Sequence, residues 1–148
     1  MSLVLDSNIL VKLVTDEPGS RKARKTIKRY LEDGYSLYTV DMALAESLNA
    51  IWKHIRIHKD LEMEEAKSAI QDLTKIYDSM NILETRELSN EAAEIALTKD
   101  ITVYDSLYIA AAMKLKAILY TADKKLCEAS RELVTSKLLD PHIHNSEL

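Results

Sequence analysis

The sequence is poor in the residues that shape small, cross-linked or turn-rich proteins. Its 148 residues include no Phe, one Trp, one Cys, two Gly and two Pro. The single cysteine, Cys127, allows no internal disulfide, which favours a reducing compartment. The scarcity of Gly and Pro excludes a small β-sandwich built on many turns and any low-complexity architecture. We therefore expect a helix-rich, cytoplasmic domain.

Charge and hydropathy narrow the class further. The net charge of −4 at pH 7 argues against holding nucleic acid through bulk charge alone, although a local basic patch is still compatible with it. No stretch approaches the ~20 apolar residues of a membrane span, so we expect no membrane contact. Hydrophobic residues make up 47% of the chain and charged residues 30%, which excludes intrinsic disorder.

Strand and helix signals alternate along the chain. Short apolar or β-branched runs predict strands at 3–5, 36–40, 81–85, 117–121 and 137–139. After a first helix that begins around residue 7, helical patterns cover 20–32, 42–57, 61–80, 89–99 (with Ser89 as its cap), 105–115 and 124–133. This alternation predicts a three-layer α/β/α fold around a mostly parallel sheet of four to five strands. We expect residues 1–140 to form one domain and 141–148 a flexible tail.

Four carboxylates lie at or just after the ends of predicted strands or in the first turns of predicted helices. Asp6 ends the first strand, and Asp123 lies just past the strand at 117–121. Glu46 lies in the opening turns of the helix after the strand at 36–40, and Asp105 starts a helix that is apolar all round. The carboxyl ends of parallel strands share one edge of the sheet, and ligands bind there where the strand order reverses. We therefore expect the four acids to converge in one cleft.

Convergence of acids has a chemical consequence. Two like charges 4 Å apart at an effective dielectric of about 20 repel by about 4 kcal/mol. The acids can respond by protonation, or a hard divalent cation can remove the repulsion, and Mg²⁺ or Mn²⁺ prefers carboxylate oxygen. Such an ion activates water and stabilises the leaving oxygen during phosphodiester hydrolysis. The acids thus predict metal-dependent hydrolysis of phosphodiester bonds.

The four acids lie in stretches that resemble a known family. LVLDSNILVKL, ALAESLNAIWK, TVYDSLYIAAA and LYTADKKL resemble, in the right order, the four acidic blocks of PIN-domain ribonucleases. The resemblance implies that Asp6, Glu46 and Asp105 hold the principal metal ion and that Asp123 completes its ligands or helps to hold a second ion. It also implies that three polar residues orient water or carboxylates around the metal: Ser7, Asn8 and Thr121.

The chain length is similar to that of the VapC-type toxins of toxin–antitoxin pairs. That resemblance implies an endoribonuclease that cleaves single-stranded RNA and leaves a 5′-phosphate and a 3′-hydroxyl. It further implies a homodimer and a small cognate antitoxin that occupies the acidic groove. Two other functions stay open: an RNA-processing nuclease without an antitoxin, and a non-catalytic module that binds RNA or a partner.

Each acid also has a purely structural interpretation. Asp6 and Asp123 can serve as helix N-caps, and Asp105 is an acid in a first helical turn, where the helix dipole favours it. Glu46 lies opposite an apolar stripe of Leu44, Leu48, Ile51 and Ile55, so the pattern alone places it on a solvated face. Asp41, which also follows a strand, is interpreted as a cap or surface group.

The basic and aromatic residues allow more than one interpretation. Six cations lie in one predicted helix and form either a charged outer face or an RNA contact: Arg21, Lys22, Arg24, Lys25, Lys28 and Arg29. Four further candidates for contacts with RNA phosphates are Lys53, Arg56, Lys124 and Lys125. The tyrosines and Trp52 fall in apolar stretches and are interpreted as core or dimer contacts.

Overall fold

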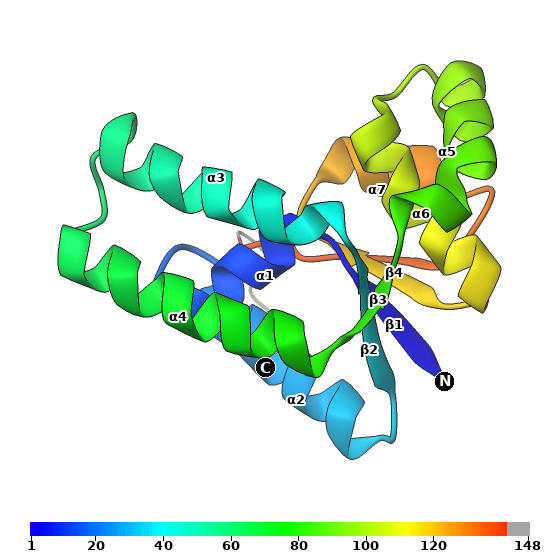
Figure 1. The fold of residues 1–148 in the computed structure, drawn as a ribbon. Coiled ribbons are helices and arrows are strands. Elements are labelled where there is room, and N and C mark those ends of the chain that lie inside the picture. Colours follow the sequence, from blue (N-terminus) through cyan, green and yellow to red (C-terminus); the bar gives the residue numbers. More distant parts are fainter. Residues whose placement is uncertain (142–148) are drawn as a thin grey trace.

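Five short strands form the central sheet of the computed structural model, which describes residues 1–141 (Figure 1). They are β1 (Ser2–Leu5), β2 (Ser36–Val40), β3 (Asn81–Leu83), β4 (Ile118–Thr121) and β5 (Ser136–Leu138). Every neighbouring pair is parallel, and the strand order is β3-β2-β1-β4-β5. The predicted α/β fold with a parallel central sheet is confirmed.

Helices cover both faces of this sheet. They are α1 (Ser7–Val14), α2 (Ser20–Glu32), α3 (Met42–Arg56), α4 (Met63–Ser79), α5 (Thr85–Lys99), α6 (Val103–Leu115) and α7 (Lys124–Ser130). Figure 1 shows α5, α6 and α7 together on one side of the sheet and α1, α2 and α4 on the other. Helices α3 and α4 pack against each other and extend away from the sheet as a two-helix arm (Figure 1).

The strand order reverses between β1 and β4. From β1 the chain crosses through α1 and α2 to β2 on one side, whereas from β4 it crosses through α7 to β5 on the other. The backbone N–H of Asp6 donates to the carbonyl of Tyr120 at 3.0 Å, which extends the pairing of β1 with β4 to the last residue before α1. In parallel sheets this kind of reversal opens a crevice at the carboxyl ends of the strands.

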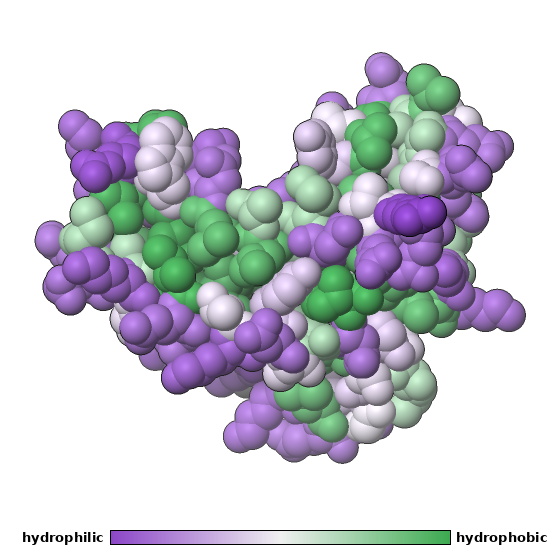
Figure 2. Space-filling view, in the orientation of Figure 1, coloured by the Kyte–Doolittle hydropathy of each residue, from purple (hydrophilic) through white to green (hydrophobic). Residues whose placement is uncertain are grey.

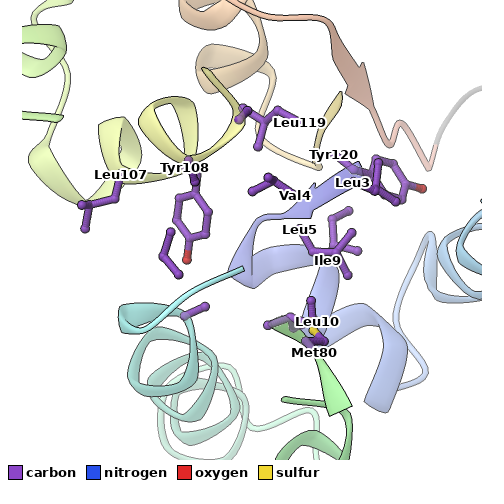
Figure 3. Close-up of a cluster of buried hydrophobic side chains, with 14 of the residues drawn as sticks. Leu3, Val4, Leu5, Ile9, Leu10, Met80, Leu107, Tyr108, Leu119 and Tyr120 are labelled. Carbon is purple, nitrogen blue, oxygen red and sulfur yellow. The ribbon is translucent and has the colours of Figure 1, made fainter. Parts of the chain in front are cut away.

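The core lies around β1 and α6. Leu3, Val4 and Leu5 are fully buried, as expected for a strand covered on both faces. In α6 every residue from Ser106 to Ala112 is buried, so the predicted all-round burial of this helix is confirmed. Figure 3 shows Tyr108 reaching from α6 into this cluster of side chains. Burial of each large apolar side chain stabilises the fold by about 1.5–3 kcal/mol, and this core holds the reversal point in place.

Several predicted element ends are wrong. Helix α5 begins at Thr85 rather than at Ser89, because Glu84 and Glu87 form a capping box in which the Glu87 carboxylate accepts from the Glu84 N–H at 2.8 Å. Ser89 is therefore an internal helical residue. Helix α7 ends at Ser130 rather than at residue 133, because the Ser130 carbonyl accepts from the N–H groups of Leu133 and Val134 in a turn.

Two further predictions concern the C-terminal tail and membrane contact. Residues 142–148, most of the predicted tail, lie outside the described residues, so the boundary near residue 140 stays a prediction. Within residues 1–141, none of the helices is long and apolar enough to cross a lipid bilayer.

Candidate active site

Asp6 occupies the reversal point, between the end of β1 and the start of α1. It is the N-cap residue of α1 by position, yet its side chain makes no capping hydrogen bond. Its Oδ2 instead accepts from Thr121 Oγ1 at 2.7 Å, and its Oδ1 accepts from Ser7 Oγ at 3.4 Å. Only 5% of the residue is exposed. The capping interpretation therefore does not explain the Asp6 carboxylate. Its hydrogen bond to Thr121 instead ties it to the end of β4.

Thr121 organises the polar groups around Asp6. Besides donating to Asp6, its hydroxyl accepts from the Asp123 N–H at 2.9 Å and from Asn8 Nδ2 at 3.4 Å. The Asn8 Oδ1 in turn accepts from the Ala122 N–H at 3.0 Å. These bonds tie the start of α1 to the loop after β4. Thr121 thus contacts the Asp6 carboxylate directly, and Asn8 contacts Thr121.

Glu46 is half-buried, and its side chain contacts α6. Its Oε1 accepts a hydrogen bond from the Tyr108 hydroxyl at 2.6 Å. The apolar stripe itself is largely buried, with Ile51 in the core, Leu44 and Ile55 packed against it, and only Leu48 37% exposed. The helix pattern misses that the side chain of Glu46 reaches α6. Partial burial raises the pKa of Glu46, the Tyr108 bond lowers it, and the charge of Asp105 raises it again.

Tyr108 is a site residue that sequence reasoning missed. It belongs to the fully apolar-looking helix α6 and is completely buried, so it is hidden among core residues. Burial first, and then the charges of Asp6 and Glu46, raise the pKa of its hydroxyl well above the ordinary value, so the group stays protonated. Its position three residues after Asp105, on the same face of a helix, is the signal that would have revealed it.

Asp105 lies in the first turn of α6, where its N–H donates to Thr102 Oγ1 at 3.1 Å. This cap starts the helix two residues earlier than the sequence predicts. Burial raises the pKa of the Asp105 carboxyl, and the charge of Asp123 raises it further. The charge of Lys125 and the Thr102 bond act in the opposite direction.

Asp123 caps α7, as its structural interpretation predicts. Its Oδ1 accepts from the N–H groups of Lys125 at 2.9 Å and Leu126 at 3.3 Å. Its charge nevertheless contributes to the raised pKa of Asp105. One carboxylate can therefore cap the helix and still influence Asp105 electrostatically.

The four acids influence one another although they come from distant parts of the chain. Burial is the largest cause that raises the pKa of Asp6 to about 7; the Thr121 bond lowers it, and the charges of Glu46 and Asp105 raise it. Asp105 is in turn coupled to Asp123. The four acids therefore lie near one another at the reversal point, where the crevice of a parallel sheet is expected.

This crevice has the chemistry of a divalent-cation site. Its ligands are carboxylate oxygens, and the negative charge that disfavours ionisation of Asp6 is what a hard cation neutralises. Within residues 1–141, no three acidic, His or Cys side chains are already arranged as a metal-binding group. Asp6, Glu46, Asp105 and Asp123 are the side chains that could hold such an ion.

The candidate phosphate-binding residues are all exposed, but they differ in their distance from the acids. Lys125 lies close enough to lower the pKa of Asp105. Lys124 precedes it in the first turn of α7. Lys53 and Arg56 lie two and three turns beyond Glu46 on α3, on the side of the helix that carries Glu46.

Comparison with known proteins shows the family to which the chain belongs. The family model of the PIN domain matches residues 3–132. Ribonuclease VapC3 of Pyrobaculum aerophilum is 32% identical over 135 residues, which cover 91% of this chain and 99% of that protein. The chain is a PIN-domain protein of the VapC family. The resemblance of its four acidic stretches to PIN-domain proteins is thereby confirmed.

Solved structures show the same fold for this VapC-family protein. PAE2754 from Pyrobaculum aerophilum superposes with a TM-score of 0.67 at 20% identity, covering 92% of this chain and 89% of that one. VapBC2 from Rickettsia felis, bound to a DNA fragment from its promoter, gives a TM-score of 0.64 at 16% identity, with coverage of 95% and 100%. At these identities the comparison shows a shared PIN fold.

Proposed function

We propose that this protein is a Mg²⁺- or Mn²⁺-dependent endoribonuclease that hydrolyses phosphodiester bonds of single-stranded RNA, as the toxin of a VapBC-type toxin–antitoxin pair. The observation that carries the proposal is the crevice at the reversal point, where the charges of Glu46 and Asp105 help to raise the pKa of the buried Asp6 to about 7. The 32% identity to a protein named ribonuclease VapC3 supports the same activity.

The four carboxylates would have different roles in holding the metal ion. Asp6, Glu46 and Asp105 would hold the principal Mg²⁺ or Mn²⁺, and Asp123 would complete its ligands or help to hold a second ion. When bound, such an ion supplies an activated water and stabilises the leaving oxygen. The acids themselves bind no substrate phosphate, because like charges repel. Their role is to create the negative site that selects a dication.

The polar neighbours keep the carboxylates in position. The Tyr108 hydroxyl fixes one oxygen of Glu46, and the Thr121 hydroxyl fixes one oxygen of Asp6. Ser7 and Asn8 complete the bonds around Asp6 and Thr121. Each bond limits the rotation of a ligand side chain and favours its ionised form. The exposed cations Lys124 and Lys125, with Lys53 and Arg56 farther away, would contact RNA phosphates.

Partners are proposed on the basis of the apolar surface of the two-helix arm. Figure 2 shows hydrophobic side chains gathered over α3 and α4, and four large ones are 37–51% exposed: Leu48, Trp52, Met63 and Ile70. A second copy of the chain in a homodimer and a cognate antitoxin that reaches the acidic groove would cover such surface. The fold similarity to VapBC2, a toxin–antitoxin complex, supports the antitoxin. Action on cellular RNA would take place in the cytoplasm.

The test is cleavage of a labelled single-stranded RNA in Mg²⁺ by Asp6→Asn and Asp105→Asn. Both variants should lose detectable cleavage while circular dichroism shows an intact fold. The matched control is Asp100→Asn, because Asp100 is exposed, lies outside the crevice and has a positive φ of 54° that Asn tolerates. Retention of Mg²⁺-dependent cleavage by both site variants would overturn the proposal.

Expression in cells tests the toxin role separately. The active protein should arrest growth, and co-expression of a cognate antitoxin should restore growth. Cleavage in vitro without growth arrest would instead indicate an RNA-processing nuclease that has no antitoxin. Failure of the protein to bind Mn²⁺ would favour the non-catalytic binding module.

A further inference from the structure

Helix α2 concentrates positive charge in an otherwise acidic protein. It carries six Lys and Arg residues and one Glu, a net charge of +5, so the other residues carry −9 of the total charge of −4. Its apolar side is narrow, with Ser20, Ala23 and Ile27 buried. The opposite side of the helix is exposed to solvent. Charge in this molecule is therefore separated between an acidic crevice and a basic helix.

Two of the six cations have structural roles. Arg24 pairs with Asp16 at 3.2 Å and donates to the Thr15 carbonyl at 3.1 Å, next to the end of α1. Lys22 donates to the Asp140 carbonyl at 3.4 Å. These contacts anchor α2 to neighbouring segments and do not require an external ligand.

Three other cations form a stripe with no such role. Arg21, Lys25 and Lys28, called here the α2 stripe, are exposed and lie at positions i, i+4 and i+7, which share one face of a helix. None of the three forms an ion pair within residues 1–141. At a rise of 1.5 Å per residue the α2 stripe is about 10 Å long. Such a row of unpaired charges attracts a polyanion.

The surroundings of the α2 stripe favour a phosphate backbone over other partners. Protein interfaces contain an apolar or aromatic centre, and helices that lie on membranes insert apolar side chains. On α2 the one large apolar side chain exposed in the described structure is Leu31, beyond the end of the stripe. Charge without apolar surface is typical of contacts with nucleic acid phosphates.

The position of α2 connects the α2 stripe to the edge that carries the acids. Leu139, just after β5, donates its N–H to the carbonyl of Thr121 at 2.8 Å. Gly19, the N-cap of α2, lies against Leu139 and Pro141. Arg21 therefore starts near the edge at which Thr121 and Asp123 lie, and α2 then runs back along the sheet (Figure 1). A strand held at the crevice could continue along this helix.

We propose that the α2 stripe is a second RNA-binding surface, which holds phosphates of the substrate strand outside the catalytic crevice. The proposal rests on RNA being the substrate, as argued under the proposed function. It predicts that the enzyme binds long single-stranded RNA more tightly than short RNA. The additional affinity is electrostatic and independent of base sequence.

The test compares Arg21→Gln/Lys25→Gln/Lys28→Gln with Lys67→Gln/Lys75→Gln/Lys116→Gln, a control that removes the same charge from exposed positions elsewhere. Binding of oligouridylates of about 4 and about 20 nucleotides is measured by fluorescence anisotropy at several salt concentrations. Loss of three phosphate contacts should reduce the slope of log K against log salt by about 2 for the long RNA. Its affinity should fall about tenfold or more at low salt, while binding and cleavage of the short RNA stay unchanged.

Three results would overturn the proposal. They are an unchanged salt slope in the stripe variant, an equal loss in the control variant, and a loss of antitoxin binding with unchanged RNA binding. The nuclease proposal fails independently of these results. If the wild-type protein binds long RNA through the α2 stripe but never cleaves it, the binding surface stands and the nuclease does not. If the wild-type protein cleaves short RNA but shows no binding that depends on the α2 stripe, the nuclease proposal stands and the binding-surface proposal fails.

Discussion

The hydroxyl of Tyr108 on α6 donates a hydrogen bond of 2.6 Å to Oε1 of Glu46 on α3. This bond joins two helices from opposite sides of the reversal point. The bond restricts the half-buried Glu46 carboxylate. It also lowers the pKa of Glu46 and so favours the ionised form. Tyr108 is thus a positioning residue for one of the proposed metal ligands.

Replacing Tyr108 by Phe should reduce RNA cleavage about 10–100-fold, as expected for loss of a hydrogen bond that orients a metal ligand. Mn²⁺ affinity, measured by calorimetry, should fall in parallel, because Glu46 loses its orientation. Tyr120→Phe is the matched control, since Tyr120 is also buried but its hydroxyl bonds to Thr26 on α2, away from the acids. Equal losses in the two variants would contradict a positioning role for Tyr108.

Replacing Thr121 by Val should move the acidic limb of the pH–activity profile to higher pH. The Thr121 hydroxyl lowers the pKa of Asp6, so without it Asp6 ionises only at higher pH. Thr121→Ser, which keeps the hydroxyl, should restore the profile. Thr39→Val removes a buried hydroxyl that donates to the Leu5 carbonyl at 2.7 Å, and it should cost stability without moving the profile. A profile unchanged in Thr121→Val would refute the assignment.

Without metal, the free energy of unfolding should fall as the pH rises from about 4 to 7. Burial raises the pKa of Asp6 from 3.8 to about 7, so over this range the folded state binds a proton that the unfolded state has lost. Asp6→Asn should weaken this dependence, and the unfolding free energy of Asp6→Asn should exceed that of the wild type at pH 8 by up to about 4 kcal/mol. The raised pKa values of Glu46 and Asp105 leave a smaller dependence in the variant. Urea unfolding in EDTA at several pH values measures both effects. A wild type more stable than Asp6→Asn at pH 8 would be inconsistent with this pKa.

Replacing Asp41 by Ala should destabilise the fold without abolishing cleavage. Asp41 also follows a strand, but its Oδ2 accepts from the Thr85 N–H at 2.9 Å and its Oδ1 from the Thr85 hydroxyl at 2.5 Å, at the start of α5. Loss of these bonds should cost about 1–2 kcal/mol of unfolding free energy. Thermal unfolding and cleavage below the melting range separate the two effects. Loss of activity with unchanged stability would make Asp41 part of the site.

The strand ends explain why part of the site could be predicted from the sequence. Asp6 and Thr121 directly end apolar runs, so a parallel sheet must bring them to one edge. The helix pattern alone places Glu46 opposite the apolar stripe of α3 and does not show that its side chain reaches Tyr108 on α6.

Other features depend on contacts that periodicity does not encode. Tyr108 looks like a core residue because its ring is in the core, and only the three-dimensional structure shows where its hydroxyl points. The start of α5 was missed because Glu84 caps it, although Ser and Thr are the commoner caps. Similarly, the six cations of α2 look alike in sequence, yet Lys22 and Arg24 are used internally.

Calorimetric titration of Mn²⁺ into wild-type protein and Asp105→Asn tests most directly whether the crevice is a metal site. The wild type should bind the ion with release of protons near pH 7, because Asp6 must ionise. Asp105→Asn should bind at least tenfold more weakly, because the site loses one of its charged ligands. Equal Mn²⁺ affinity in the two proteins, or no binding by the wild type, would contradict the account.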